Sequence, residues 1–234
     1  MTRINPFVNS CAFEYWCRCN MEIIPAILEP TWQEIEKKIK LVDGLTDWIQ
    51  LDICDGEFAE GKTWGNPQDL FSLQVKSKIE AHLMIKEPWI WADEWLSSPA
   101  KRIVAHVEAF SSPESLKFGE IAFTAQKYGK EVVWGFNIET DWEPYKELMQ
   151  KPHVRVLFLS VVPGRQGQEF DRNVFEKIAS LKEKHPHVKI CLDGGINPGL
   201  IDEIEKFGAD SVAVGSYVFQ SSDPAKAISE FNKG

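Results

Sequence analysis

The sequence predicts an α/β fold, a single (β/α)8 TIM barrel with parallel strands. From Met21 onward, short apolar runs alternate with longer amphipathic stretches, and eight of the apolar runs have strand character. Parallel strands need crossover connections, and eight such repeats within about 210 residues match a barrel that closes on itself. A doubly wound open sheet is the alternative. No linker rich in Pro, Gly or Ser divides the 234 residues, which indicates one domain.

The expected strands are short segments rich in β-branched and aromatic residues. In order they cover residues 22–28, 48–53, 79–84, 102–108, 131–137, 154–161, 188–193 and 210–214. Helices are expected between them, as in 31–43 and in 171–185. The apolar residues that recur at helical spacing in 31–43 are Trp32, Ile35, Ile39 and Val42. Two connections are longer than the rest: 54–66 and 162–170.

The first 20 residues, MTRINPFVNSCAFEYWCRCN, lack both periodicity and the continuous apolar segment of a secretory signal. We therefore expect an irregular N-terminal extension over residues 1–20, followed by the barrel domain over 21–234. The other interpretation is an upstream start codon, with the natural beginning of the protein at Met21.

Composition narrows the classes of partner. The formal charge is −9, from 35 acidic and 26 basic side chains, and without a Lys/Arg cluster nucleic acid is not an expected partner. No apolar stretch approaches the roughly 20 residues that a spanning helix needs, so no membrane is expected either. The 5 cysteines include no pair of CxxC units, which favours neither a zinc ribbon nor a disulfide framework. The expected setting is a reducing cytoplasm.

Polar residues at the ends of strands indicate the position of a site. In IQLDICDG, residues 49–56, alternation along a strand puts Gln50, Asp52 and Cys54 on one face, while Asp55 is expected to begin and order the next loop. A half-exposed strand at a sheet edge would explain that polar face. In a barrel, however, the carboxyl ends of the strands meet at the working face. The polar residues that would converge there are Gln50, Asp52, His82, His106, Glu108, Asn137, Ser160 and Asp193.

Asp52, His82 and Asp193 are candidate ligands of one divalent metal ion. Two carboxylates and an imidazole suit Zn, Mn or Fe(II), with Mg as a further candidate, and Gln50 offers a neutral carbonyl oxygen. The alternative for His82 is a core histidine paired with a neighbouring carbonyl. A metal could polarise a ketone and its neighbouring hydroxyl, while the two aspartates exchange the proton between them from opposite faces. Such an arrangement inverts a stereocentre.

Glycine-rich segments follow the last three expected strands: PGRQGQ (163–168), DGG (193–195) and VGS (214–216). Glycine lets the backbone approach an anion closely, and backbone amides after the seventh and eighth strands commonly bind phosphate in this fold. We therefore expect a small phosphorylated substrate.

From Met21 to about Phe231 the chain resembles the ribulose-phosphate 3-epimerase family. The matching stretches are PAIL (25–28), LDICDG (51–56) with Phe58, AHLMI (81–85), AHVEA (105–109), SVVPGRQGQEF (160–170), LDGGIN (192–197) and VGSYVF (214–219). The resemblance implies a (β/α)8 barrel, and conversion of D-ribulose 5-phosphate to D-xylulose 5-phosphate through a metal-stabilised enediolate. It also implies a place in the pentose phosphate pathway of carbohydrate metabolism, and a homo-oligomer.

Carried over by position, the resemblance implies that Asp52 and Asp193 are the catalytic acid and base and also metal ligands. His82 would be a further ligand, and Gln50 occupies the position of the remaining one. The phosphate and substrate contacts would come from Met84, Ser160, Gly164, Arg165, Gly167, Gly194, Gly195, Gly215 and Ser216.

Several positions depart from the family pattern. Gln50 stands where the family has a histidine ligand, and Ala26 where it has a serine. The other departures are Cys54 on the second strand, Glu57, Glu60 and Gly61 in the lid-like stretch DGEFAEG, and Val162, Arg165 and Gln166 after the sixth strand. A neutral amide should weaken metal binding and move the preference toward Mn or Mg. Arg165 is expected either to clamp the phosphate or to be a solvated loop residue.

Three functions are weighed on this basis. The first is a metal-dependent 3-epimerase of D-ribulose 5-phosphate, or of another ketose phosphate such as allulose 6-phosphate. The second is a catalytically impaired homologue that only binds a sugar phosphate. The third is a decarboxylase or synthase on a related barrel, which would typically place a lysine beside the strand-end acids.

Overall fold

The computed structural model describes residues 21–165 and 167–231. The expected N-terminal extension, residues 1–20, and Gln166 lie outside the described residues. The division of the chain at residue 20 therefore stays a prediction.

Eight parallel strands pair in sequence order and close into a barrel, with β8 returning to β1. The strands are β1 Glu22–Ile27, β2 Trp48–Cys54, β3 Lys78–Met84, β4 Arg102–His106, β5 Glu131–Phe136, β6 Arg155–Leu159, β7 Lys189–Asp193 and β8 Ser211–Val214. The predicted (β/α)8 fold is confirmed. The ring leaves β2 without a free edge, which excludes both the open sheet and the edge-strand explanation of its polar face.

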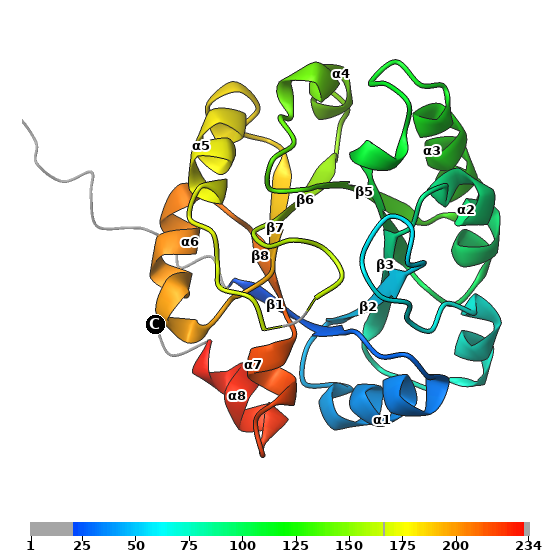
Figure 1. Cartoon of the computed structure of the whole chain (residues 1–234), viewed down its shortest axis with the longest axis vertical. Helices are drawn as coiled ribbons and strands as arrows, with labels where there is room; N and C mark the ends of the chain where they lie inside the picture. Colours follow the sequence, from blue (N-terminus) through cyan, green and yellow to red (C-terminus); the bar gives the residue numbers. More distant parts are fainter. Residues whose placement is uncertain (1–20, 166, 232–234) are drawn as a thin grey trace, which may run out of the picture.

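Helices surround the ring of strands (Figure 1). They are α1 Trp32–Val42, α2 Pro88–Ser97, α3 Lys117–Tyr128, α4 Lys146–Met149, α5 Val174–Lys184, α6 Ile201–Phe207, α7 Ser216–Phe219 and α8 Pro224–Glu230. Thr31 caps the first turn of α1 by accepting from the Glu34 N–H. As expected from their spacing, Ile35, Ile39 and Val42 form the buried face of α1, whereas Trp32 is only partly buried against it. Each such side chain contributes roughly 1.5–3 kcal/mol by burial. Within the described part of the chain, none of the helices has the length and apolar character needed to cross a membrane.

Short helical turns occupy some of the connections. They are η1 Pro67–Ser72, η2 Val107–Ala109, η3 Glu143–Tyr145 and η4 Pro198–Leu200. The fourth strand is therefore shorter than the predicted 102–108, because the chain turns into η2 after His106. Glu108 thus lies just beyond β4 rather than on it.

Side chains alternate between the inside of the barrel and the layer of helices. Ile49, Leu51 and Ile53 of β2 belong to the large outer cluster that includes the helix residues. A smaller cluster fills the inside with Ile24, Ala26, Trp48, Val104, Val133, Leu157, Leu159, Cys191 and Ala213. Cys54 and Cys191 are both buried free thiols.

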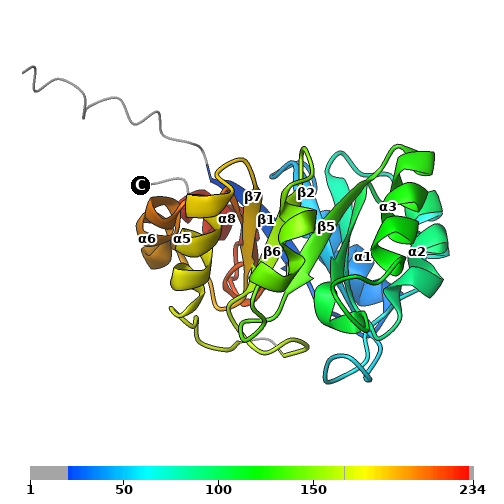
Figure 2. The same cartoon turned by 90° about the horizontal axis from the view of Figure 1, so that it is seen from above.

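A buried ion pair lies near the amino ends of β3 and β4. Glu80 and Arg102 bond to each other with their side chains 2% and 3% exposed, and the Arg102 guanidinium lies 3.7 Å from the Trp48 ring centroid. Glu80 is also the register partner of Gln50 on β2, so the pair lies directly below the polar residues at the carboxyl ends. The loops that follow β2 and β6 extend at one end of the barrel, as Figure 2 shows.

Candidate active site

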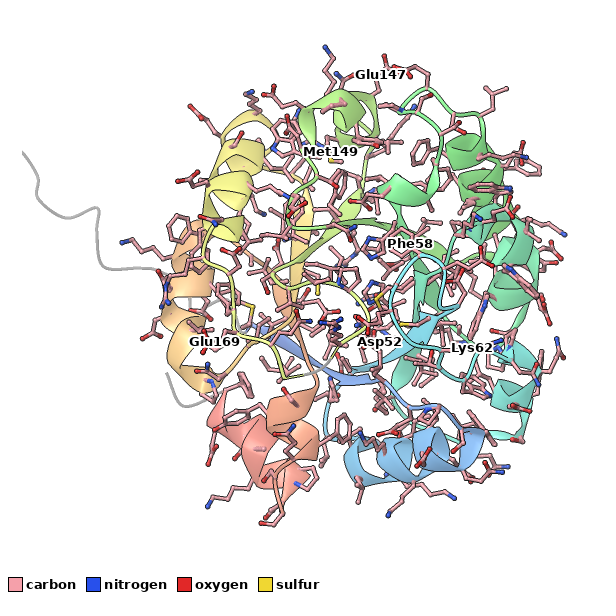
Figure 3. The ribbon with its side chains drawn as sticks, viewed as in Figure 1. Asp52, Phe58, Lys62, Glu147, Met149 and Glu169 are labelled. Carbon is pink, nitrogen blue, oxygen red and sulfur yellow. The ribbon has the colours of Figure 1, made fainter. Side chains whose placement is uncertain are left out.

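Asp52, His82 and Asp193 meet inside the barrel at the carboxyl ends of β2, β3 and β7. The Nδ1 atom of His82 lies 3.0 Å from Asp52 Oδ1 and 3.3 Å from Asp193 Oδ2. Asp52 and His82 are register partners on adjacent strands, and Figure 3 places Asp52 within the ring of strands. Asp193 is on β7, which β8 and β1 separate from β2 in the barrel. The inward residues of those two strands, Ala213 and Ala26, are small and leave room for its side chain.

Gln50 is fully buried beside these groups. Its Nε2 donates to Asp52 Oδ1 and to Asp193 Oδ2, both at 2.7 Å, and lies 3.2 Å from His82 Nδ1. Its Oε1 is buried without a hydrogen-bond partner. The amide of Gln50 therefore links the two carboxylates, an arrangement that strand alternation alone does not predict.

Burial and neighbouring charges shift the pKa values of Asp52 and His82. Burial raises the pKa of Asp52, and the charge of Asp193 adds to this, against opposing hydrogen bonds from His82 and Gln50. Burial alone would lower the pKa of His82, but its hydrogen bonds to Asp193 and Asp52 and the charges of both outweigh burial and raise the pKa to about 10. Asp52 therefore holds a proton more readily than an exposed aspartate does.

The same donors suit a divalent metal. One ligand atom from each of Asp52, His82 and Asp193 lies within 4.8 Å of the others. The amide oxygen of Gln50 is buried and unpartnered, and a turn of the amide would bring this hard donor to the place where Nε2 now meets the carboxylates. Two carboxylates, an imidazole and an amide oxygen fit Mn, Fe(II) or Zn, so the residues present match the predicted metal group.

A pocket opens above these three residues and is bounded by the predicted phosphate segments. Its lining includes Met84, Gly164, Arg165, Gly167, Gly194, Gly195, Gly215 and Ser216, together with Asp52, His82 and Asp193. Ala26, where the family has a serine, also lines it. No lysine occurs among the described lining residues, although a lysine is what the decarboxylase or synthase alternative would need.

Ser160 lies behind the pocket wall. It is fully buried, and its hydroxyl donates to the backbone oxygens of Asp193 and Gly194 at 3.0 and 2.6 Å. Its contacts therefore hold the carboxyl end of β7 in place, and it is absent from the lining of the pocket.

Two loops meet across the pocket mouth. Arg165 pairs with Glu60, and the side chains of both are more than half exposed. Gly164 packs against the backbone of Glu60, where a Cβ would lie 2.3 Å from the Glu60 oxygen. This pairing was not predicted from the sequence. The sequence feature that could have indicated it is that Glu60 and Arg165, two departures from the family pattern, carry opposite charges and lie in the two long connections.

Asp55 orders the loop after β2, as expected. Its Oδ1 accepts from the N–H groups of Glu57 and Phe58 at 2.8 and 2.9 Å, and its Oδ2 accepts from Lys86 N–H at 2.7 Å. Phe58, labelled in Figure 3, lies with its ring centroid 5.1 Å from that of His106. The loop therefore covers the His106 side of the site.

The sequence of the chain matches a known protein family. The sequence profile of the Ribulose-phosphate 3 epimerase family matches residues 22–219. The chain is 30% identical to ribulose-phosphate 3-epimerase of Mycobacterium bovis, over 90% of this chain and 91% of that protein. It is 28% identical to the cytoplasmic isoform of ribulose-phosphate 3-epimerase of Oryza sativa subsp. japonica, over 91% and 93%.

Solved structures agree on the fold. The 3-hexulose-6-phosphate synthase of Salmonella typhimurium superposes with a TM-score of 0.64 at 16% identity, covering 91% of this chain and 97% of that one. At that identity the likeness concerns architecture alone. The family follows from the sequence matches, which extend through every strand of the barrel. The chain therefore belongs to the ribulose-phosphate 3-epimerase family.

Proposed function

We propose that the protein is a metal-dependent 3-epimerase of a ketose phosphate, with D-ribulose 5-phosphate as substrate and D-xylulose 5-phosphate as product. The observation that carries the proposal is the convergence of Asp52 and Asp193 in the pocket lining, where they lie 3.0 and 3.3 Å from His82 Nδ1. Membership of the family supports an isomerase, and the pocket adds the residues that would perform the reaction.

The two aspartates supply the proton transfers. One carboxylate takes the proton from C3, and the electron pair of the C–H bond moves into the C2 carbonyl to give an enediolate. The other carboxyl, initially protonated, delivers its proton to the opposite face of C3. Burial raises the pKa of Asp52, and a raised pKa makes its carboxylate a stronger base than that of an exposed aspartate.

Asp52, His82, Asp193 and Gln50 would hold the divalent ion. When bound, the ion would polarise the substrate carbonyl and its neighbouring hydroxyl, which lowers the cost of removing the C3 proton. In the structure Gln50 turns its Nε2 toward both carboxylates, so ligation through its Oε1 would require the amide to turn over.

The phosphate is assigned to the glycine-lined side of the pocket. Gly194, Gly195, Gly215 and Ser216 follow β7 and β8, where backbone N–H groups bind phosphate in this fold. A longer ketose phosphate, such as allulose 6-phosphate, is the second candidate substrate, because Ala26 leaves more space in the lining than the serine of the family pattern.

The test is hydrogen exchange at C3. Protein stripped of metal and then restored with Mn, Fe(II) or Zn is incubated with D-ribulose 5-phosphate in deuterated water and followed by NMR. We expect metal-dependent deuterium incorporation at C3 with formation of D-xylulose 5-phosphate. Folded protein that exchanges neither this substrate nor allulose 6-phosphate would favour the impaired, sugar-phosphate-binding homologue instead.

Replacing Gln50 by histidine is expected to tighten metal binding by at least about tenfold, or 1.4 kcal/mol, because an imidazole is a stronger ligand than an amide oxygen for Zn. Calorimetric titration of metal-free protein with Zn measures the change. Gln220→His, at an exposed position, controls for adventitious binding by an added imidazole. Equal affinities of native and Gln50→His protein would remove Gln50 from the ligand set.

Replacing Arg165 by alanine is expected to lower kcat/KM about tenfold, because the guanidinium can leave Glu60 and pair with the substrate phosphate in a charge-assisted bond. The exposed Arg165–Glu60 pair itself contributes little to stability, so the melting temperature should not change. Arg172→Ala, which breaks a comparable surface pair with Glu203, is the control. An Arg165→Ala variant with native kinetics would make Arg165 a solvated loop residue.

Other expectations stay predictions: a cytoplasmic location, assembly into a homo-oligomer, and the absence of nucleic-acid and membrane partners. The name of the Oryza sativa relative concerns that protein's location. Size-exclusion chromatography with light scattering addresses the oligomeric state.

A further inference from the structure

A series of hydrogen bonds starts at His82, from the ring nitrogen that faces away from Asp52 and Asp193. His82 Nε2 lies 2.8 Å from His106 Nε2, and His106 Nδ1 lies 3.2 Å from Glu108 Oε2. The other oxygen of Glu108 accepts the backbone N–H of Asn137 at 2.7 Å. Both imidazoles are fully buried, so water cannot substitute for these contacts.

The direction of each hydrogen bond follows from Glu108, the last residue of the series. Ionised Glu108 can only accept, so His106 carries its proton on Nδ1. A neutral His106 then has a lone pair on Nε2, and that lone pair can accept only from a proton on His82 Nε2. His82 therefore keeps its Nε2 proton, and when a metal takes the place of its other proton the lone pair is on Nδ1, the atom that faces Asp52 and Asp193.

The strands also make room for this arrangement. A Cβ at Gly135 on β5 would lie 2.9 Å from the Cδ2 and Nε2 atoms of His106. Phe58 lies over the same imidazole from the loop after β2. The position of His106 is therefore fixed from two sides, and its ring has little freedom to turn.

We propose that Glu108 and His106 are positioning residues that set the tautomer of His82, so that Nδ1 presents its lone pair to the metal. This rests on the metal dependence in the proposed function. Neither residue touches the substrate or the ion in this role. They act through His82, as the outer partners of metal-bound histidines commonly do.

The change Glu108→Gln tests the proposal without altering shape. The Asn137 N–H can only donate, so the amide oxygen of the substituted side chain must stay with it and the amide NH2 must face His106 Nδ1. Two donors then meet unless His106 reverses its tautomer, and reversal places a proton on His82 Nδ1. Either outcome opposes metal binding, and we expect Zn affinity to fall about 10- to 100-fold.

Calorimetric titration with Zn compares native protein, Glu108→Gln and Glu139→Gln, the last removing an equal charge from an exposed position after β5. Only Glu108→Gln should weaken binding. A second measurement needs no variant: in Zn-loaded native protein labelled with 15N-histidine, NMR should find His106 protonated at Nδ1 and not at Nε2.

The outcomes separate this proposal from the proposed function. Native binding of one Zn with unchanged affinity in Glu108→Gln, or His106 protonated at Nε2, would overturn the positioning role alone. Native protein that binds none of Zn, Mn and Fe(II) would overturn the metal dependence and this role together.

Discussion

Replacing either Asp52 or Asp193 by asparagine is expected to lower kcat for epimerisation about 10²- to 10⁴-fold, the range that a general acid or base contributes. Asparagine keeps the size of the side chain and an oxygen for the metal but cannot carry the proton. The fold should survive, because Asp52 and Asp193 lie in the pocket lining rather than in the apolar cluster inside the barrel.

The two variants should differ in hydrogen exchange. Epimerisation needs both faces of C3, whereas exchange of the C3 proton needs only one working carboxylate. Asp52→Asn should therefore still exchange the C3 proton of one epimer, and Asp193→Asn that of the other. NMR in deuterated water, with D-ribulose 5-phosphate and D-xylulose 5-phosphate as separate substrates, measures this.

Metal content must be followed in the same samples, because both residues are also assigned as ligands. Asp202→Asn, on the exposed side of α6, controls for the loss of one negative charge. Full activity in Asp52→Asn or Asp193→Asn would exclude the two-aspartate reaction. Loss of exchange with both epimers, at native metal content, would mean that the aspartates do not act on separate faces.

Replacing Gly164 by alanine should also have a large effect, lowering kcat/KM about 10²-fold, because it displaces the loops that bound the pocket. A Cβ at Gly164 would lie 2.3 Å from the oxygen and 2.8 Å from the nitrogen of Glu60, and backbone atoms cannot move aside as a flexible side chain can. The loop after β2 and the loop after β6 would have to separate.

Gly167 is the matched control in the same loop. Its φ of +73° is close to the +89° of Gly164, so alanine costs similar backbone strain at both positions, but nothing lies within 4 Å of a Cβ at Gly167. The difference between the two variants in kcat/KM therefore measures the packing of the two loops. Equal kinetics in Gly164→Ala and Gly167→Ala would show that loop contact does not affect catalysis.

The eight strands and the inward position of Gln50 and Asp52 could be predicted from the sequence, because alternation along a strand is a local property. Local spacing also predicted the buried face of α1 and the loop-ordering role of Asp55. The segments around Gly164, Gly194 and Gly215 could be placed around one pocket because parallel strands share a carboxyl end.

The contacts between strands could not be predicted in the same way. The contact of His82 with His106 depends on the register between β3 and β4, and that of Gln50 with Asp193 joins β2 and β7, which are distant in the sequence and not neighbours in the barrel. Ser160 illustrates the limit: its place at the end of β6 was correct, but only the neighbouring backbone oxygens show that its hydroxyl is already occupied.

The buried pair of Glu80 and Arg102 bears on how accurately the barrel assembles. The two residues are register partners on β3 and β4, two and four positions before His82 and His106. A slip of one residue would turn one charged side chain toward the helices and leave the other unpaired inside, at a cost of several kcal/mol. The ion pair therefore favours one register of β3 and β4. In that register His82 and His106 lie at hydrogen-bond distance at the carboxyl ends of the same strands.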